Sequence, residues 1–337
     1  MKIGILTGGG DCPGLNQAIR GCVVQSLCFG NECIGILEGW KGLYHAESIP
    51  LPIEEVDKIV GKGGTIVGTS RFNLIRRDHG IETVKANMAM MGIDALVAMG
   101  GEDTLGVASR LFSSGVNIVG VPKTIDNDLF ATDYTFGFHS AVSRAVEACE
   151  SLIDTGTSHR RIMVAEVMGR HAGWVAAFTS LAAGADWCIV PEFPNDYEAM
   201  YTHLAKVWKR KKTGLVIVSE GVELFKDSEE KECDDFGHRT VGGVAETIAD
   251  MIQRSTGIET RSSQFGHIQR GGSPTVYDRI LGLRVGVKAA ELIEEKKFGM
   301  MACLRGDRVE AVSLEKAVEK LKTLEKSWFE LAHLFFY

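Results

Sequence analysis

The chemically richest segment is Lys123–Asp128, which packs a lysine, a hydroxyl and two carboxylates into six residues directly after an apolar run. A second apolar run, Asp94–Met99, leads into the polar glycine turn Gly100–Thr104, which carries two more carboxylates. Each segment has the pattern of a strand that ends in a loop, and the ends of neighbouring parallel strands lie together at the carboxyl edge of an open α/β sheet. A glycine turn with a carboxylate suits a magnesium-bound polyphosphate, and the neighbouring segment could hold an acceptor alcohol and its base. The pair predicts phosphoryl transfer.

A third glycine-rich turn, Gly8–Asp11, follows the first apolar run and precedes a helix predicted to begin near Leu15. Glycines let the backbone approach a phosphate, and a helix N-terminus offers free N–H donors. The turn lacks the dinucleotide fingerprint, because Pro13 stands where the third glycine belongs, and the chain has no Gly-Lys-Ser/Thr motif. Taken alone, the segment is equally consistent with a structural turn.

Four motifs in order resemble the 6-phosphofructokinase family, and the similarity runs from Lys2 to about Arg308. They are Gly100–Thr104, Pro122–Asp128, Met168–Arg170 and Gly266–Gly272. The resemblance implies transfer of a phosphoryl group to fructose 6-phosphate with Mg²⁺ as cofactor.

Within that family, Asp103 and Lys123 resemble the branch that uses pyrophosphate, since ATP-using bacterial relatives typically have glycine at both positions. A carboxylate at 103 would crowd and repel a nucleoside α-phosphate, while Lys123 could reach a smaller donor. Three alternatives remain at this stage. They are an ATP-dependent 6-phosphofructokinase, another kinase with a similar glycine turn that acts on NAD or a lipid, and a catalytically inactive sugar-phosphate sensor. A sensor would be expected to lose Asp126, and the other kinases would not need the Gly266–Gly272 motif.

The resemblance also assigns roles to individual residues. Asp126 matches the general base, and Asp128 matches a residue that orients or assists it. The catalytic group is Thr124, Asp126, Asp128 and Arg170. The expected donor-binding residues are Gly10, Arg71, Asp103 and Lys123. The expected acceptor-binding residues are Arg161, Met168, Gly169, Arg170, Glu220, Arg261, His267 and Arg270.

Glu102 occupies the position at which most relatives have a magnesium-binding aspartate, so it is the expected metal residue, either directly or through water. Thr124, Asp126 and Asp128 alternate along the chain, which predicts that their side chains point the same way from an extended segment. In relatives, Arg161 and Arg261 reach into a neighbouring subunit's site. The resemblance therefore implies a homodimer or homotetramer with active sites at subunit interfaces.

Apolar runs alternate with helical patterns along the chain, which predicts βαβ units with parallel sheets. The expected strands are Lys2–Thr7, Cys33–Leu37, Asp94–Met99, Asn117–Val121, Arg161–Val167, Trp187–Val190 and Gly214–Glu220. Helical spacing marks segments such as Phe138–Asp154 and Arg170–Ala183. We expect two doubly wound, mostly parallel α/β domains facing each other across a catalytic cleft. The predicted donor domain is 1–138 plus 270–307, and the predicted fructose 6-phosphate domain is 139–269 plus 308–337.

The bulk properties fit this picture. The chain has 337 residues, is 45% hydrophobic and carries a formal net charge of −7, which argues against nucleic-acid and anionic-membrane partners. No apolar run reaches the length of a membrane span, and the N-terminus lacks a signal-peptide core, so a cytoplasmic location is expected. The eight cysteines include no Cys-x-x-Cys pair and are expected to be reduced. The charged stretch Lys226–Asp235 is predicted to be an exposed loop, and the aromatic residues 335–337 are predicted to pack.

Overall fold

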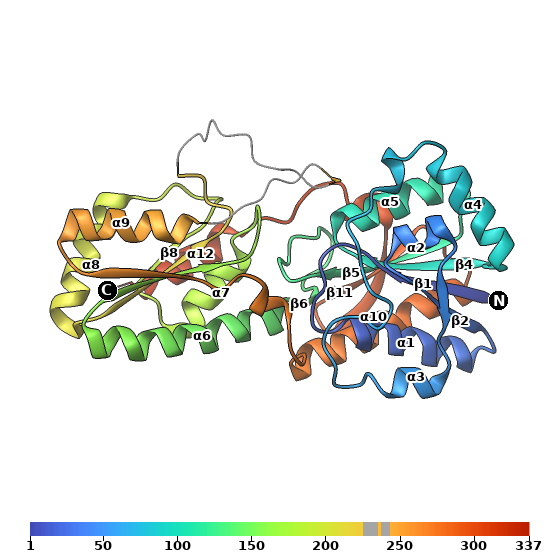
Figure 1. Cartoon of the computed structure of the whole chain (residues 1–337), viewed down its shortest axis with the longest axis horizontal. Helices are drawn as coiled ribbons and strands as arrows, with labels where there is room; N and C mark the ends of the chain where they lie inside the picture. The colour runs from blue at the N-terminus through green and yellow to red at the C-terminus, as the bar shows by residue number, and fades with distance from the viewer. Residues whose placement is uncertain (225–234, 237–242, 337) are drawn as a thin grey trace.

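A computed structural model of the chain describes residues 1–224, 235–236 and 243–336, which form two α/β bodies side by side (Figure 1). The predicted loop at Lys226–Asp235 and the terminal Tyr337 lie largely or wholly outside the described residues. Among the helices that the structure describes, none is both long and apolar enough to span a bilayer.

The first body is built on an eight-stranded sheet in the order β12-β11-β5-β4-β1-β2-β3, with β6 paired to β5. Its strands are β1 (Lys2–Thr7), β2 (Glu32–Ile36), β3 (Ser48–Pro50), β4 (Ala95–Gly100), β5 (Ile118–Thr124), β6 (Phe136–Gly137), β11 (Met300–Arg305) and β12 (Arg308–Ser313). Strands β4 and β5 are buried along their whole length, as continuous apolar runs in a sheet covered on both faces should be. They pair in parallel, with Ala98 opposite Gly120. The prediction that their exits lie side by side is confirmed.

The helices of the first body cover both faces of this sheet. They are α1 (Leu15–Cys28), α2 (Trp40–His45), α3 (Ile53–Asp57), η1 (Leu74–Arg76), α4 (Gly80–Met91), α5 (Glu102–Ser113), α10 (Val276–Glu294) and α11 (Leu314–Ala317). One core cluster joins α1 and α10 to β1 and β4, and a second joins α4 and α5 to the opposite face. Helices α1 and α10 approach so closely that a Cβ on Gly286 would lie 2.1 Å from the Ala18 carbonyl oxygen. Glycine is therefore required at that contact.

The second body has a four-stranded, all-parallel sheet in the order β10-β7-β9-β8. Its strands are β7 (Ile162–Val167), β8 (Trp187–Ile189), β9 (Gly214–Ser219) and β10 (Thr260–Gln264). Its helices are α6 (Phe138–His159), α7 (Trp174–Ala183), α8 (Tyr197–Lys211), α9 (Val244–Thr256), η2 (Gly266–Arg270) and α12 (Lys326–Leu334). The α/β architecture with two mostly parallel sheets is as predicted, and all seven predicted strands are present with bounds shifted by at most three residues.

The predicted boundary at residue 308 differs from the structure. Strand β12 pairs antiparallel with β11, with Met301 opposite Val312, and α11 packs against α5 in the first body. The two strands are joined by the two-residue turn Gly306-Asp307, a glycine-containing hairpin signal that the sequence reading passed over. The chain therefore leaves the first body only after α11, and it is α12 that packs on the second body.

The cysteines that the structure describes, seven of the eight, are all free, and six of those are buried. At the C-terminus, Phe336 stacks on Trp187 at a centroid distance of 5.5 Å, consistent with a packing role for that residue.

Candidate active site

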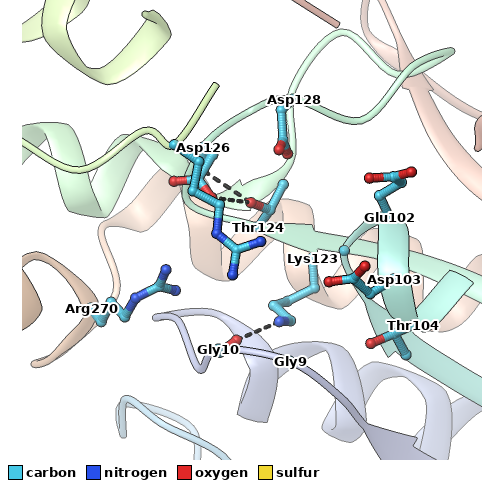
Figure 2. A pocket seen from close by; sticks show the side chains of 12 residues that line it. Gly9, Gly10, Glu102, Asp103, Thr104, Lys123, Thr124, Asp126, Asp128 and Arg270 are labelled. Atoms are coloured by element: carbon cyan, nitrogen blue, oxygen red, sulfur yellow. Dashed lines mark hydrogen bonds between the residues drawn. The ribbon is translucent and has the colours of Figure 1, made fainter. Parts of the chain in front are cut away.

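One pocket opens where the carboxyl ends of β1, β4 and β5 face the second body (Figure 2). It is lined by Gly9, Gly10, Gly101, Glu102, Asp103, Thr104, Lys123, Thr124, Asp126, Asp128, Arg170 and Arg270. Arg170 follows β7 and Arg270 ends η2, both in the second body, and the other residues come from the first body. The fold thus gathers four carboxylates, three cations and three backbone turns from distant parts of the sequence.

The floor of the pocket is the glycine turn after β1. A Cβ on Gly10 would lie 2.6 Å from Nη1 of Arg270, and a Cβ on Gly8 would lie 2.5 Å from Oγ1 of Thr104. Side chains at either position would displace these neighbours, so the turn stays bare and its backbone remains open to a ligand. Arg270 also donates to the carbonyl oxygen of Asp11 at 3.1 Å, which ties the Gly266–Gly272 motif to this turn.

Lys123 occupies the centre of the pocket and points toward the glycine turn, where its ammonium donates to the Gly10 carbonyl (Figure 2). The side chain is only 3% exposed. Burial lowers the pKa of Lys123 to about 8, although Asp126 and Asp11 partly oppose that change. A buried ammonium with few partners is poised to bind an anion, because an anionic ligand would offset its desolvation.

The carboxylates Glu102 and Asp103 lie on the opposite side of Lys123 from Gly10, in the first turn of α5. Acidic residues at this position favour the helix dipole. They also place two negative charges on the side of Lys123 that faces away from Gly10. The sequence reading did not single out Thr104 or Gly9, although Thr104 belongs to the same motif and both line the pocket.

Thr124 and Asp126 form a local hydrogen-bonded turn at the end of β5. The Asp126 backbone N–H donates to Oγ1 of Thr124 at 3.0 Å, and the Thr124 hydroxyl donates to Oδ2 of Asp126 at 3.3 Å. Asp126 is 4% exposed, and its other oxygen, Oδ1, is buried without a hydrogen-bond partner among the described residues. A buried carboxylate oxygen without a donor is costly, which is expected where a substrate hydroxyl supplies the missing bond.

The predicted extended alternation of Thr124, Asp126 and Asp128 is wrong. Strand β5 ends at Thr124, and Asn127 adopts a left-handed conformation with φ of 53°. The Asn127 side chain accepts a hydrogen bond from the Thr135 backbone N–H at 3.2 Å, which holds the turn. All three predicted side chains nevertheless line the pocket, because the turn redirects Asp128 toward it.

Negative charges are crowded on this side of the pocket. Burial and the neighbouring Asp126 raise the pKa of Asp128. Burial and the same aspartate raise the pKa of Glu220 to about 7, even though Glu220 accepts backbone N–H bonds from Gly169 and Arg170 at 3.3 and 3.2 Å. A cationic ligand or a proton would relieve this repulsion.

Several predicted acceptor residues lie beside the pocket without lining it. Met168 and Gly169 are buried after β7, and Glu220 follows β9, the neighbouring strand. His267, and Arg71, which was predicted to bind the donor, are exposed and are not among the pocket-lining residues.

Two predicted acceptor residues, Arg161 and Arg261, lie at the amino-terminal ends of β7 and β10, opposite the end that carries Met168. A six-residue strand spans roughly 20 Å. Both arginines bind the exposed Glu259, at 2.9 and 2.6 Å. They therefore cannot complete the pocket of their own chain.

The same pocket contains Glu102, the residue predicted to bind the metal. Within the part of the chain that the structure describes, no group of three or more His, Cys, Asp or Glu side chains is arranged to hold a metal ion. Mg²⁺ is commonly bound by one or two carboxylates together with substrate phosphates and water. Asp126, whose Oδ1 has no hydrogen-bond partner among the described residues, and Glu102 both line this pocket. The residues present fit a magnesium ion that arrives with a phosphate ligand.

Comparisons with known proteins agree with this geometry. A model of the phosphofructokinase family matches residues 2–293. The chain is 45% identical over 341 residues to a pyrophosphate–fructose 6-phosphate 1-phosphotransferase of Dictyoglomus thermophilum, covering 100% of this chain and 99% of that protein. It is also 44% identical over 328 residues to an ATP-dependent 6-phosphofructokinase of Corynebacterium efficiens, covering 96% and 95%. The solved phosphofructokinase of Saccharomyces cerevisiae matches with a TM-score of 0.81 at 30% identity over 99% of this chain, which spans about half (47%) of the yeast chain. The chain belongs to the phosphofructokinase family.

Proposed function

We propose that this protein transfers a phosphoryl group from pyrophosphate to the 1-hydroxyl of fructose 6-phosphate, giving fructose 1,6-bisphosphate and phosphate. The observation that carries the choice of donor is the pair Asp103 and Lys123, which line the same pocket beside the Gly9-Gly10 turn. Overall similarity does not separate the donors, because relatives named for pyrophosphate and for ATP are 45% and 44% identical to this chain.

On the donor side, pyrophosphate lies against the Gly10 backbone with its charge met by Lys123. In the free protein the Lys123 ammonium donates a hydrogen bond to the Gly10 carbonyl oxygen. When pyrophosphate binds, the ammonium donates instead to a negatively charged phosphate oxygen, which is a stronger acceptor. A nucleotide would have to pass its α-phosphate and nucleoside beyond Asp103, whose charge repels them. Arg71 is proposed as a further donor contact.

On the acceptor side, Asp126 takes the proton from the 1-hydroxyl while that oxygen bonds to phosphorus. The bond from phosphorus to the bridging oxygen of pyrophosphate breaks, and the leaving phosphate keeps the electron pair. Thr124 orients Asp126 through their mutual hydrogen bonds. Arg170, which lines the pocket from the second body, stabilises the negative charge that spreads over the equatorial oxygens of the transferred phosphoryl group. Asp128 assists the base.

The remaining acceptor contacts follow from the resemblance. Met168, Gly169 and Glu220 shape the sugar site beside the pocket, and His267 and Arg270 bind the 6-phosphate. Glu102 is the proposed holder of Mg²⁺, with Asp128 near it. The ion supplies charge neutralisation of the phosphates when bound.

The proposed assembly is a homodimer or homotetramer. Arg161 and Arg261 stand at the far end of β7 from Met168, so they can bind substrate phosphate only in a neighbouring chain's site. Since the proposed acceptor is a sugar phosphate of central metabolism, we also propose a cytoplasmic location, with no nucleic-acid or membrane partner.

The test is a donor comparison in four proteins: wild type, Asp103→Gly, Lys123→Gly and the double variant. The wild type should have a far higher kcat/KM for pyrophosphate than for ATP. Asp103→Gly should raise ATP use, because it removes the repulsion. Lys123→Gly should lower pyrophosphate use about 10- to 100-fold, equivalent to losing a charged hydrogen bond of about 1.5–3 kcal/mol. The double variant should shift the donor ratio furthest, and not additively.

Asp103→Gly also introduces a glycine into helix α5, and a glycine costs about 1 kcal/mol in a helix interior. Ser109→Gly, in the same helix, is the matched control for this loss of helix propensity. It should leave the donor ratio unchanged. A wild type that prefers ATP, or a double variant with the wild-type donor ratio, would refute the choice of pyrophosphate.

A further inference from the structure

The segment between α11 and α12, residues 318–325, crosses from the first body to the second, and we call it the C-terminal strap (Figure 1). On the first body it pairs with the loop that follows the catalytic turn. Leu321 forms an antiparallel bridge with Leu129, and the Lys322 backbone N–H donates to the Asp128 carbonyl at 2.7 Å. The main chain of a proposed catalytic residue is thus fixed to the strap.

The side chain of Lys322 strengthens the same attachment. Its ammonium donates to the carbonyl oxygens of Thr132 and Asp133 at 3.0 and 2.6 Å, and it lies 5.8 and 5.1 Å from the ring centroids of Tyr134 and Trp174. These distances permit cation–π attraction. Burial lowers the pKa of Lys322 to about 8, with Asp133 and Asp128 opposing that change. The ammonium is thus held by two carbonyl oxygens and lies near two aromatic rings.

The strap is bound to the second body at the same residue. The Trp174 indole N–H donates to the Lys322 carbonyl at 3.0 Å, and the Leu324 backbone N–H donates to Oε1 of Glu192 at 2.7 Å. Glu192 also accepts the Gly173 backbone N–H at 2.8 Å. Trp174 begins α7, four residues after Arg170. Lys322 therefore touches the loop of Asp128 on one side and the segment of Arg170 on the other.

We propose that Lys322 is a positioning residue that sets the separation of the Asp126–Asp128 turn from the Arg170 segment across the cleft. The inference rests on the proposed function, in which Asp126 acts on the reacting hydroxyl and Arg170 on the transferred phosphoryl group. Misplacement of reacting groups by about 1 Å can cost about 10²-fold in rate. The backbone of Lys322 hydrogen-bonds to Asp128, which lines the pocket, and to Trp174, which lies four residues after the pocket-lining Arg170.

The experiment compares Lys322→Met, Lys322→Arg and Trp174→Phe with the wild type. Lys320→Met is the matched control, because Lys320 belongs to the same strap and contacts only the Phe130 ring, at 4.5 Å, among the interactions seen for it. Lys322→Met should lower kcat about 10- to 100-fold while KM for pyrophosphate and fructose 6-phosphate stays within about threefold. Lys322→Arg should recover part of kcat, and Lys320→Met should resemble the wild type.

Trp174→Phe keeps an aromatic ring at this position but removes the indole N–H donor, so it should also lower kcat. If Trp174 and Lys322 act through the same contact, the fall in kcat of the double variant should be smaller than the product of the two single-variant falls. If Lys322→Met does not fold, Trp174→Phe carries the test. A Lys322→Met enzyme with kcat within about twofold of wild type, or with a raised KM and unchanged kcat, would overturn the inference. A wild type that uses neither donor would instead refute the proposed function on which the inference stands.

Discussion

Replacing Asp126 with asparagine should separate catalysis from folding. The amide keeps the shape of the side chain and can still bond to the Thr124 hydroxyl, but it cannot accept a proton from the sugar. Loss of a general base costs roughly 10²–10⁴ in turnover, equivalent to about 2.7–5.4 kcal/mol of activation free energy. The unpaired oxygen Oδ1, buried in the pocket, is the atom whose loss should produce this effect.

Stability should not fall with activity in this variant. The negative charge of Asp126 contributes to the raised pKa values of both Asp128 and Glu220. Removing that charge relieves repulsion among three carboxyl groups, so Tm should stay the same or rise. KM for fructose 6-phosphate should change little, because the proposed phosphate-binding residues are untouched.

The assay is steady-state formation of fructose 1,6-bisphosphate in the presence of pyrophosphate and Mg²⁺, with Tm measured on the same samples. Asp133→Asn is the control, since Asp133 lies in the same loop but is exposed, and its side-chain carboxylate accepts only from the Gly306 backbone N–H among the bonds seen for it. It should keep turnover within about twofold of wild type. An Asp126→Asn enzyme with near-native turnover would refute the assignment of the base. A large fall in Tm would refute the electrostatic reasoning.

Three further predictions concern other parts of the site. The pKa of Glu220 is raised in the folded protein, so the contribution of this carboxyl group to the free energy of unfolding is complete below about pH 4.5 and is lost as pH rises through about 7. This loss is worth about 3 kcal/mol, and calorimetry should show a smaller decline with pH for Glu220→Gln. Gly10→Ala places a Cβ 2.6 Å from Arg270 and should raise KM for fructose 6-phosphate about tenfold, whereas Gly106→Ala, with open space around its Cβ, should not. Mixing inactive Arg161→Ala and Asp126→Asn proteins should restore part of the activity if sites are shared between chains; no recovery in mixed oligomers would contradict this.

Much of the pocket could be predicted from sequence because the strand exits carry its chemistry. The continuous apolar runs identified β4 and β5, and parallel pairing placed Glu102 beside Lys123 without further information. Short-range signals of this kind depend only on local composition and on the geometry of parallel sheets.

Features that depend on long-range packing were less accessible. The left-handed Asn127 turn, which replaced the expected extended segment, is fixed by Thr135 from outside the motif. The attachment of Arg270 to the glycine turn, and the double role of Lys322, bring together residues that are far apart in sequence. Strand β12 was missed because its burial alternates at a sheet edge and gives only a weak apolar signal.

The reverse reaction tests the central claim most directly. Incubated with fructose 1,6-bisphosphate, orthophosphate and Mg²⁺, with no nucleotide, the wild-type protein should form pyrophosphate and fructose 6-phosphate, both of which ³¹P NMR resolves. The Asp126→Asn protein should form neither at a comparable rate. If the wild type forms no pyrophosphate under these conditions, yet produces fructose 1,6-bisphosphate from fructose 6-phosphate and ATP, then the account of the donor site at Asp103 and Lys123 is wrong.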